Sequence, residues 1–84
     1  MSVFIIVSQT ESAPTLQTAI KEKYPNDHYE LHSNQWLVSA GETAQEISDK
    51  LGITAATIVF SVSSYWGRSN PNVWEWLKVK WEKS

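Results

Sequence analysis

Hydrophobic and polar positions along the chain form blocks whose spacing predicts strands and helices in alternation. Val3 to Ser8 is a short β-branched and aromatic run that is apolar on both faces, as is typical of a central strand. Ser12 and Pro14 favour the start of a helix soon after it, and Pro25 ends the helical spacing that follows. The N-terminal part of the chain therefore predicts a strand followed by a helix.

The next block predicts a β-hairpin. Two short β-prone runs are separated by two residues, which is the commonest hairpin loop length. This turn would place Leu31 opposite Trp36 and Tyr29 opposite Val38, as cross-strand pairs on one buried face. The two runs are His28–His32 and Gln35–Ala40, joined by the turn Ser33–Asn34.

A second helix and a last strand follow the hairpin. Thr43 and Glu46 have the spacing of a capping box, in which each side chain satisfies a free backbone N–H at the start of a helix. Gly52 stands where a left-handed C-terminal cap belongs. Residues 57–63 then alternate as a strand, and the apolar residues that share one face of it are Ile58, Phe60 and Val62.

The element order is β-α-β-β-α-β followed by a tail, and this order folds most simply as a ferredoxin-like α+β sandwich with sheet order 4-1-3-2. Both helices of such a sandwich cover one face of the sheet. The other face would lie bare to water, and an exposed apolar patch usually marks a partner surface. We expect the tail to fold over this face, a second subunit to stack on it, or both. In the predicted register the bare face carries Phe4, Ile6, Leu37 and Val59.

Four of the five tryptophans lie within the last 19 residues, in the tail and in the loop that leads into it. Asn70 followed by Pro71 is typical of a helix start, and a helical stripe from there carries Trp74, Leu77 and Trp81. A fifth strand is the alternative, because charged residues interrupt the apolar ones at nearly every second position. We favour the helix, and expect one domain over residues 1–84 that includes a C-terminal docking segment, residues 70–83. Trp76 and Val79 would point away from the docking face.

Composition excludes several classes of protein. A chain of 84 residues makes one domain with a small core, for which dimerisation is a common source of stability. The absence of cysteine excludes disulfides, thiolate zinc sites and a cysteine nucleophile. The N-terminal apolar run has five residues and no basic flank, and no stretch approaches the ~20 residues that span a bilayer. We therefore expect a cytoplasmic protein without a membrane partner.

Charge is divided unevenly along the chain. Residues 1–63 carry three lysines against seven acidic residues, whereas residues 64–84 carry four basic residues against two acidic ones. Proteins that grip nucleic-acid phosphates present a basic surface, because counterion release supplies most of their non-specific affinity. The tail is the part of this chain that could supply one.

The loop that precedes the tail is the strongest candidate for a binding element. Tyr65, Trp66 and Arg68 offer two rings and a guanidinium, which suit stacking and phosphate contact with a single-stranded nucleic acid, or a protein interface. The alternative is that the rings anchor the loop to the core. The full set of candidate binding or interface residues is Tyr65, Trp66, Arg68, Trp76, Lys78, Lys80 and Leu37.

No metal site or cofactor is expected. His28, Glu30 and His32 alternate along one strand and project to the same face. The two histidines are four residues apart, which on a strand is ~13 Å, so they cannot hold one ion together. A solvated face on an edge strand is the preferred interpretation.

Several segments together resemble a known family. The hairpin Leu31–Ala40, the helix Thr43–Leu51, and an aromatic and glycine loop leading into a helix near Trp76-Leu77 are similar to those of small SinR-like proteins. These are related to the CRISPR-associated spacer-acquisition subunit and to a metal-dependent endoribonuclease. The resemblance spans nearly the whole chain and implies a ferredoxin-like fold and a homodimer.

The chain departs from that family at the end of the first strand. Members of the wider family typically carry an aspartate there, which holds a divalent ion across a two-fold axis. This chain has Ser8-Gln9-Thr10 instead, and a neutral hydroxyl is a poor ligand for a hard cation. Catalysis is therefore not expected.

Three functions remain for this sequence. The preferred one is a homodimeric interaction or regulatory module that binds through the apolar sheet face and Trp76, which requires no chemistry. The second is a nucleic-acid-binding protein that uses the aromatic loop and the basic tail. The third is a degenerate metal-dependent endoribonuclease.

Overall fold

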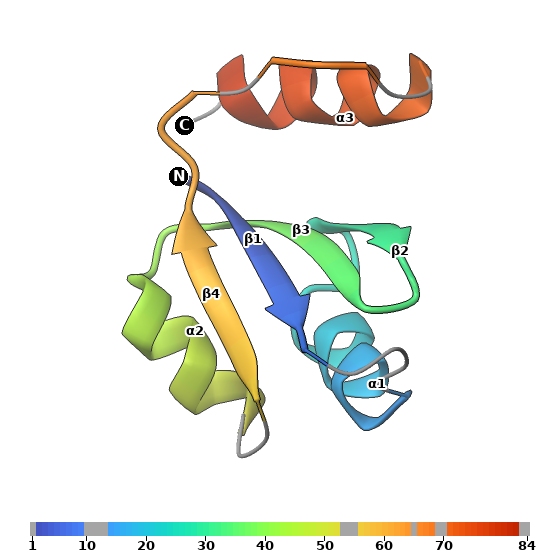
Figure 1. The fold of residues 1–84 in the computed structure, drawn as a ribbon. Helices are drawn as coiled ribbons and strands as arrows, with labels where there is room; N and C mark the ends of the chain where they lie inside the picture. The colour runs from blue at the N-terminus through green and yellow to red at the C-terminus, as the bar shows by residue number, and fades with distance from the viewer. Residues whose placement is uncertain (1, 10–13, 53–55, 65, 69–70, 83–84) are drawn as a thin grey trace.

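The structure is a computed structural model that describes residues 2–9, 14–52, 56–64, 66–68 and 71–82. Within these residues the chain forms one four-stranded antiparallel sheet and three helices, which confirms the predicted small α+β class (Figure 1). The elements are, in order, β1 (Ser2–Ser8), α1 (Pro14–Lys23), β2 (His28–His32), β3 (Gln35–Ala40), α2 (Ala44–Leu51), β4 (Thr57–Ser61) and α3 (Pro71–Glu82).

The sheet has the order β2-β3-β1-β4, which is β4-β1-β3-β2 when it is read from the other edge. β1 lies inside the sheet and pairs antiparallel with both β3 and β4. Its residues are apolar on both faces because α1 and α2 cover one face of the sheet and α3 packs on part of the other. Val3, Phe4 and Ile6 are all nearly fully buried.

The helices α1 and α2 cover one face of the sheet and enclose the larger hydrophobic core. Ile6 of β1 lies opposite Trp36 of β3 on one side and opposite Val59 of β4 on the other, so the three side chains share this face. Below the helices, buried residues from all these elements form one cluster. Its members are Phe4, Ile6, Ile20, Tyr24, Trp36, Val38, Ala40, Ile47 and Leu51, with Val59 packed against them.

The predicted assignment of faces is therefore wrong for Phe4, Ile6 and Val59, which lie under the helices and not on the far face. The physical reason is that side chains alternate along a strand, so a change of one residue exchanges the two faces. A strand that is apolar on both faces carries no pattern that distinguishes them. Leu37 does lie on the far face.

The hairpin has the predicted turn at Ser33 and Asn34, but its register differs from the prediction. Tyr29 lies opposite Leu37, and Glu30 lies opposite Trp36. The ladder shifts between Glu30 and His32, where β2 has an irregularity of the β-bulge kind. Such a bulge places an additional residue in one strand, which moves every pair beyond it by one position. The expected pairs of Leu31 with Trp36 and of Tyr29 with Val38 are wrong for this reason.

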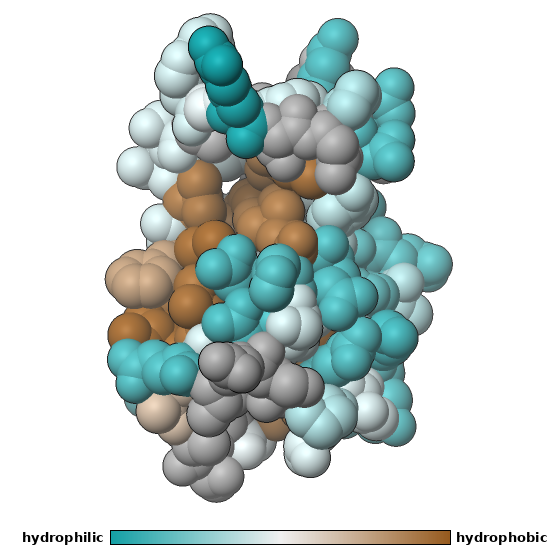
Figure 2. Space-filling model, turned by 45° about the vertical axis from the view of Figure 1, so that its right-hand side comes forward, coloured by the Kyte–Doolittle hydropathy of each residue, from teal (hydrophilic) through white to brown (hydrophobic). Residues whose placement is uncertain are grey.

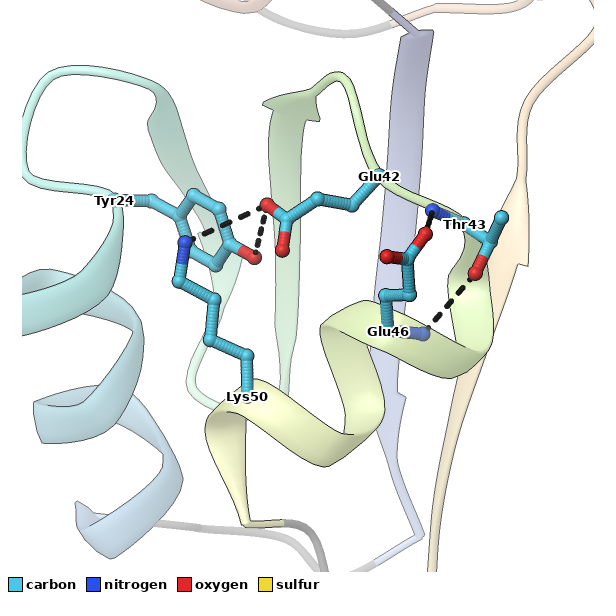
Figure 3. Close-up of polar contacts among 5 residues, drawn as sticks. All are labelled: Tyr24, Glu42, Thr43, Glu46 and Lys50. Carbon is cyan, nitrogen blue, oxygen red and sulfur yellow. Dashed lines mark hydrogen bonds and ion pairs between the residues drawn. The ribbon is translucent and has the colours of Figure 1, made fainter.

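The start and the end of α2 follow the sequence prediction. The Glu46 N–H donates to the Thr43 hydroxyl at 3.1 Å, and the Thr43 N–H donates to the Glu46 carboxylate at 3.0 Å (Figure 3). Gly52 caps the other end in the left-handed conformation with φ 65°. A side chain at that φ would be strained, so glycine fits this position.

The tryptophan-rich tail is a helix, α3, and not a fifth strand. Figure 1 shows it apart from α1 and α2, crossing the sheet at the end where β1 begins and β4 finishes. Val73 and Leu77 of α3 form a second buried cluster with Val3 and Leu37. The tail thus folds over part of the far sheet face of its own chain. None of the described helices is long and apolar enough to cross a membrane.

Candidate interaction surface

The far face of the sheet is only partly covered by α3. The helix packs mainly on β1 and β2, whereas β4 lies at the opposite edge of the sheet from β2. Ile58 is 42% exposed and Phe60 is 50% exposed. Both belong to the far face, because they lie opposite Val7 and Ile5 of β1, and Ile5 packs in the cluster below α3. We call Ile58 and Phe60 the β4 strip.

Figure 2 shows hydrophobic residues gathered below the segment at the top of the view, which is α3, and continuing down one side of the molecule. The sequence around the β4 strip is also free of charge. Lys50 is the last charged residue before β4, and Arg68 is the first one after it. An apolar side chain of this size costs about 1.5–3 kcal/mol when it is left in water rather than fully buried. Two such residues side by side on an uncharged strand make this strand a candidate partner surface.

The loop after β4 carries two of the candidate binding residues on the outside of the protein. Trp66 is 100% exposed, and Arg68 is also exposed. The idea that Trp66 anchors the loop to the core is therefore wrong. Tyr65 lies outside the described residues. The exposed surface thus extends from the β4 strip into the loop that follows the strand.

Trp76 has an intramolecular role, contrary to the sequence prediction. Its indole lies against the ring of Tyr29 on β2, with ring centroids 6.2 Å apart and ring planes at 56°. It also packs beside the buried cluster of α3, as Trp74 and Trp81 do. Val79 does point outward, as predicted, and is 49% exposed. Trp76 is therefore part of the docking of α3.

The two candidate lysines of the tail differ in their surroundings. The Lys80 ammonium donates to the Asp27 carboxylate at 2.7 Å and to the Asn26 carbonyl at 3.1 Å, which ties α3 to the turn between α1 and β2. A phosphate would have to compete with these partners for Lys80. Lys78 is exposed. Of the two, Lys78 is the one that faces solvent.

Leu37 is not available to a partner in this arrangement. It is only 5% exposed and packs with Val73 and Leu77 of α3. Of the expected covers for this face, the tail is the one found over Leu37, so the candidate assignment of Leu37 to a partner interface is wrong. Its side chain is part of the core that holds the tail in place.

Ser8 at the end of β1 and His28 at the start of β2 both make hydrogen bonds within the chain. Ser8 is buried, and its main chain bonds to Asn34 in the hairpin turn: the Ser8 N–H donates to the Asn34 carbonyl, and the Asn34 amide donates to the Ser8 carbonyl. His28 donates from Nδ1 to the Tyr24 carbonyl at 2.6 Å, so this ring is part of the link between α1 and β2. Among the described residues, no group of three or more His, Cys, Asp or Glu could hold a metal ion.

Three residues on the helical side form a polar cluster (Figure 3). The Tyr24 hydroxyl donates to the Glu42 carboxylate at 3.1 Å, and Lys50 pairs with the same carboxylate at 3.5 Å while its ammonium lies 4.8 Å from the centre of the Tyr24 ring. Burial of the phenol raises the pKa of Tyr24 to about 12, and the hydrogen bond and negative charge of Glu42 add to the rise. The cluster joins the end of α1 to α2, and it is a structural contact.

Comparisons with known proteins add no assignment. No model of a known protein family matches the chain, and no curated protein matches it significantly. The exposed surface around β4 is therefore the feature that indicates a function.

The β4 strip is the feature that the sequence prediction missed. The pattern of residues 57–63 places Ile58, Phe60 and Val62 on one face, but it does not say which of them α3 covers. Val62 packs in the cluster of α3, and the other two remain exposed. A signal was nevertheless present, since a strand at a sheet edge usually carries a charge or a proline that blocks pairing. β4 carries neither.

Proposed function

We propose that the protein is a small homodimeric interaction or regulatory module that associates through the β4 strip and not through Leu37. The observation that carries this proposal is the half-exposure of Ile58 and Phe60 on a strand without charge. α3 packs on the far face over β1 and β2, so among the described residues of that face the β4 strip is the most exposed apolar part. The proposal requires no metal, cofactor or reacting group.

The expected strength of such an association is modest. Each of the two side chains is already about half-buried, so burying the remainder is worth roughly 0.75–1.5 kcal/mol per residue. Two copies contribute four side chains, or roughly 3–6 kcal/mol before any cost. Association of two proteins costs about 4 kcal/mol or more in lost translational and rotational freedom. The strip alone therefore does little more than offset this cost, and further contacts are needed for a dimer.

The test is the mass of the protein in solution. Sedimentation equilibrium of the wild type should give about twice 9.6 kDa at high protein concentration. Phe60→Ser should shift the equilibrium towards monomer, because it removes half of the strip. The matched control is Val79→Ser, which removes a similarly exposed apolar side chain from α3 and should leave the dimer intact. A wild type that is monomeric at every concentration refutes the proposal.

We further propose a ferredoxin-like sandwich as the fold type and membership of the SinR-like group. The order β1-α1-β2-β3-α2-β4 and the sheet order β2-β3-β1-β4 support the fold assignment. Where members of the wider family typically carry a metal-binding aspartate, at the end of the first strand, this chain has Ser8-Gln9-Thr10. Residual metal-dependent cleavage of RNA that disappears in Ser8→Ala would revise the proposal towards the degenerate endoribonuclease.

A second candidate function is binding of single-stranded nucleic acid by the loop after β4. The full exposure of Trp66 close to the exposed Arg68 favours it, since an exposed ring offers a face on which a base can stack. Labelled single-stranded RNA and DNA should then bind with a steep dependence on salt, and Trp66→Ala should weaken the binding. No binding at low salt removes this candidate and leaves the interaction module unaffected.

A further inference from the structure

The two edges of the sheet are unequal. β2 forms one edge and carries Glu30, two histidines and a register irregularity, which are features that discourage pairing with another strand. β4 forms the other edge, and among the described residues it pairs with β1 alone. It has the sequence TIVFS, with no charge, proline or glycine. The β4 edge is thus the one that is open to a further strand.

The hydrogen bonds to β1 show which main-chain groups of β4 are free to pair. The Val62 N–H donates to Val3 and the Gln9 N–H donates to Ala56, at the two ends of the β1–β4 ladder. In an antiparallel ladder the bonded residues alternate, so the even-numbered residues of β4 bond to β1. The residues between them direct their N–H and C=O groups to the open edge. These are Thr57, Val59 and Ser61.

The sequence of β4 is symmetric in residue type about its centre. Val59 is flanked on both sides by a large apolar residue, Ile58 or Phe60, and then by a hydroxyl residue, Thr57 or Ser61. An antiparallel partner with the same sequence would therefore meet like with like. Threonine opposite serine, and an aromatic residue opposite a β-branched one, are favourable cross-strand pairs. The absence of charge means that two copies do not repel each other at this edge.

We propose that two copies of the chain pair β4 with β4 in antiparallel orientation, with a two-fold axis at Val59, so that the two four-stranded sheets become one continuous sheet. This inference rests on the proposed homodimer and specifies its contact. Val59 then bonds to Val59 of the second copy, and Thr57 bonds to Ser61 of the second copy. All three residues with outward main-chain groups are used, in about six hydrogen bonds.

The same arrangement completes the β4 strip. Ile58 of one copy lies opposite Phe60 of the other on the far face, as a non-hydrogen-bonded pair in which side chains approach most closely. The four side chains form one apolar cluster across the two-fold axis. The main-chain hydrogen bonds between the two β4 strands are the further contacts that a dimer needs beyond burial of the β4 strip. A closed two-fold contact also uses the β4 edge of each sheet and leaves only the β2 edges, which discourage pairing, so assembly stops at a dimer.

A cysteine cross-link tests this register directly, because the chain contains no cysteine. Thr57→Cys and Ser61→Cys are prepared as separate full-length proteins, and both leave the β4 strip intact. In the proposed dimer, residue 57 of one copy and residue 61 of the other are paired, with Cα atoms ~5.5 Å apart, which a disulfide spans. Two copies of residue 61 lie ~13 Å apart, which a disulfide does not span.

Mild oxidation of an equal mixture should therefore give a disulfide-linked dimer in which the two variants are joined, whereas either variant alone should stay unlinked. Mass spectrometry identifies the linked peptides. Ser61→Pro provides the second arm: it removes an N–H that points to the open edge, so it should dissociate the dimer while leaving the β1 ladder in place. A dimer by sedimentation that gives no mixed cross-link, or that survives Ser61→Pro, overturns the β4 pairing and leaves the homodimer standing. A monomeric wild type overturns both.

Discussion

The ring of Tyr29 on β2 lies against the indole of Trp76 on α3, with a centroid separation of 6.2 Å and an interplanar angle of 56°. This tilted arrangement is one of the favourable geometries for aromatic pairs. It joins the edge strand of the sheet to the tail, and Lys80 one turn further along α3 bonds to Asp27 beside the same strand. The tail is therefore fixed at several points along its length.

Replacing Trp76 should loosen the tail. Trp76→Leu keeps an apolar side chain but removes the ring contact, and should lower the free energy of unfolding by about 0.5–1.5 kcal/mol. Urea unfolding measures the change. The matched control is Trp66→Leu, because Trp66 is fully exposed and its loss should leave stability unchanged. Equal losses in the two variants would mean that the ring contact does not stabilise the fold.

Leu37→Asp should unfold the domain rather than separate two subunits. Leu37 is buried under α3, so the substitution removes a core side chain and places a carboxyl group among apolar residues. A loss of at least about 3 kcal/mol is expected. Circular dichroism and urea unfolding report it, with Val79→Asp as the exposed control on the other side of α3. A folded, monomeric Leu37→Asp would contradict this and indicate that a partner, and not α3, covers the face.

Stability should depend on alkaline pH through Tyr24. Its pKa in the folded state is about 12, above the usual value of 10.0, so the folded protein holds the phenol proton more tightly than the unfolded chain. The resulting stability is fully present below about pH 10 and is lost as the pH rises through the folded-state value of about 12. Urea unfolding over this window should therefore show a fall that is smaller in Tyr24→Phe. Tyr29→Phe serves as the control, and identical pH profiles for the wild type and Tyr24→Phe would contradict the assignment.

Signals that lie within a few consecutive residues predicted the local structure well. The capping box of Thr43 and Glu46, the left-handed Gly52 and the hairpin turn depend on neighbouring residues alone, and each is found in the structure. The helix that begins at Pro71 is of the same kind, because proline fits the first turn of a helix; the predicted cap, Asn70, lies outside the described residues.

Features that depend on distant contacts were predicted less well. β1 is apolar on both sides, so its sequence could not tell which face the helices cover. The register shift in β2 pairs Tyr29 with Leu37 and not with Val38, and no residue in the run His28–His32 signals this shift. In both cases the outcome is set by packing against other elements, and not by the strand itself.

The tail shows the same limit at the level of the site. Trp74 and Trp81 share one side of α3 and Trp76 lies on the other, so their spacing did not show that all three pack beside one buried cluster. The structure centres that face on Val73 and Leu77, with Trp76 at its side and Lys80 at its end. The sequence pattern therefore predicts that Trp76 contacts a binding partner, whereas in the structure its ring contacts Tyr29 of the same chain. The β4 strip is exposed because α3 does not extend over it, and the sequence does not show how far α3 extends over the sheet.

Residue-resolved amide hydrogen exchange of the wild type tests whether β4 of one copy pairs with β4 of another. The amides of Ile58 and Phe60 bond to β1 within each copy, so their protection should not depend on protein concentration. The amides of Thr57, Val59 and Ser61 point to the open edge, so their protection should rise with protein concentration as the dimer forms. Fast exchange at these three amides in a sample that sedimentation shows to be dimeric would contradict it.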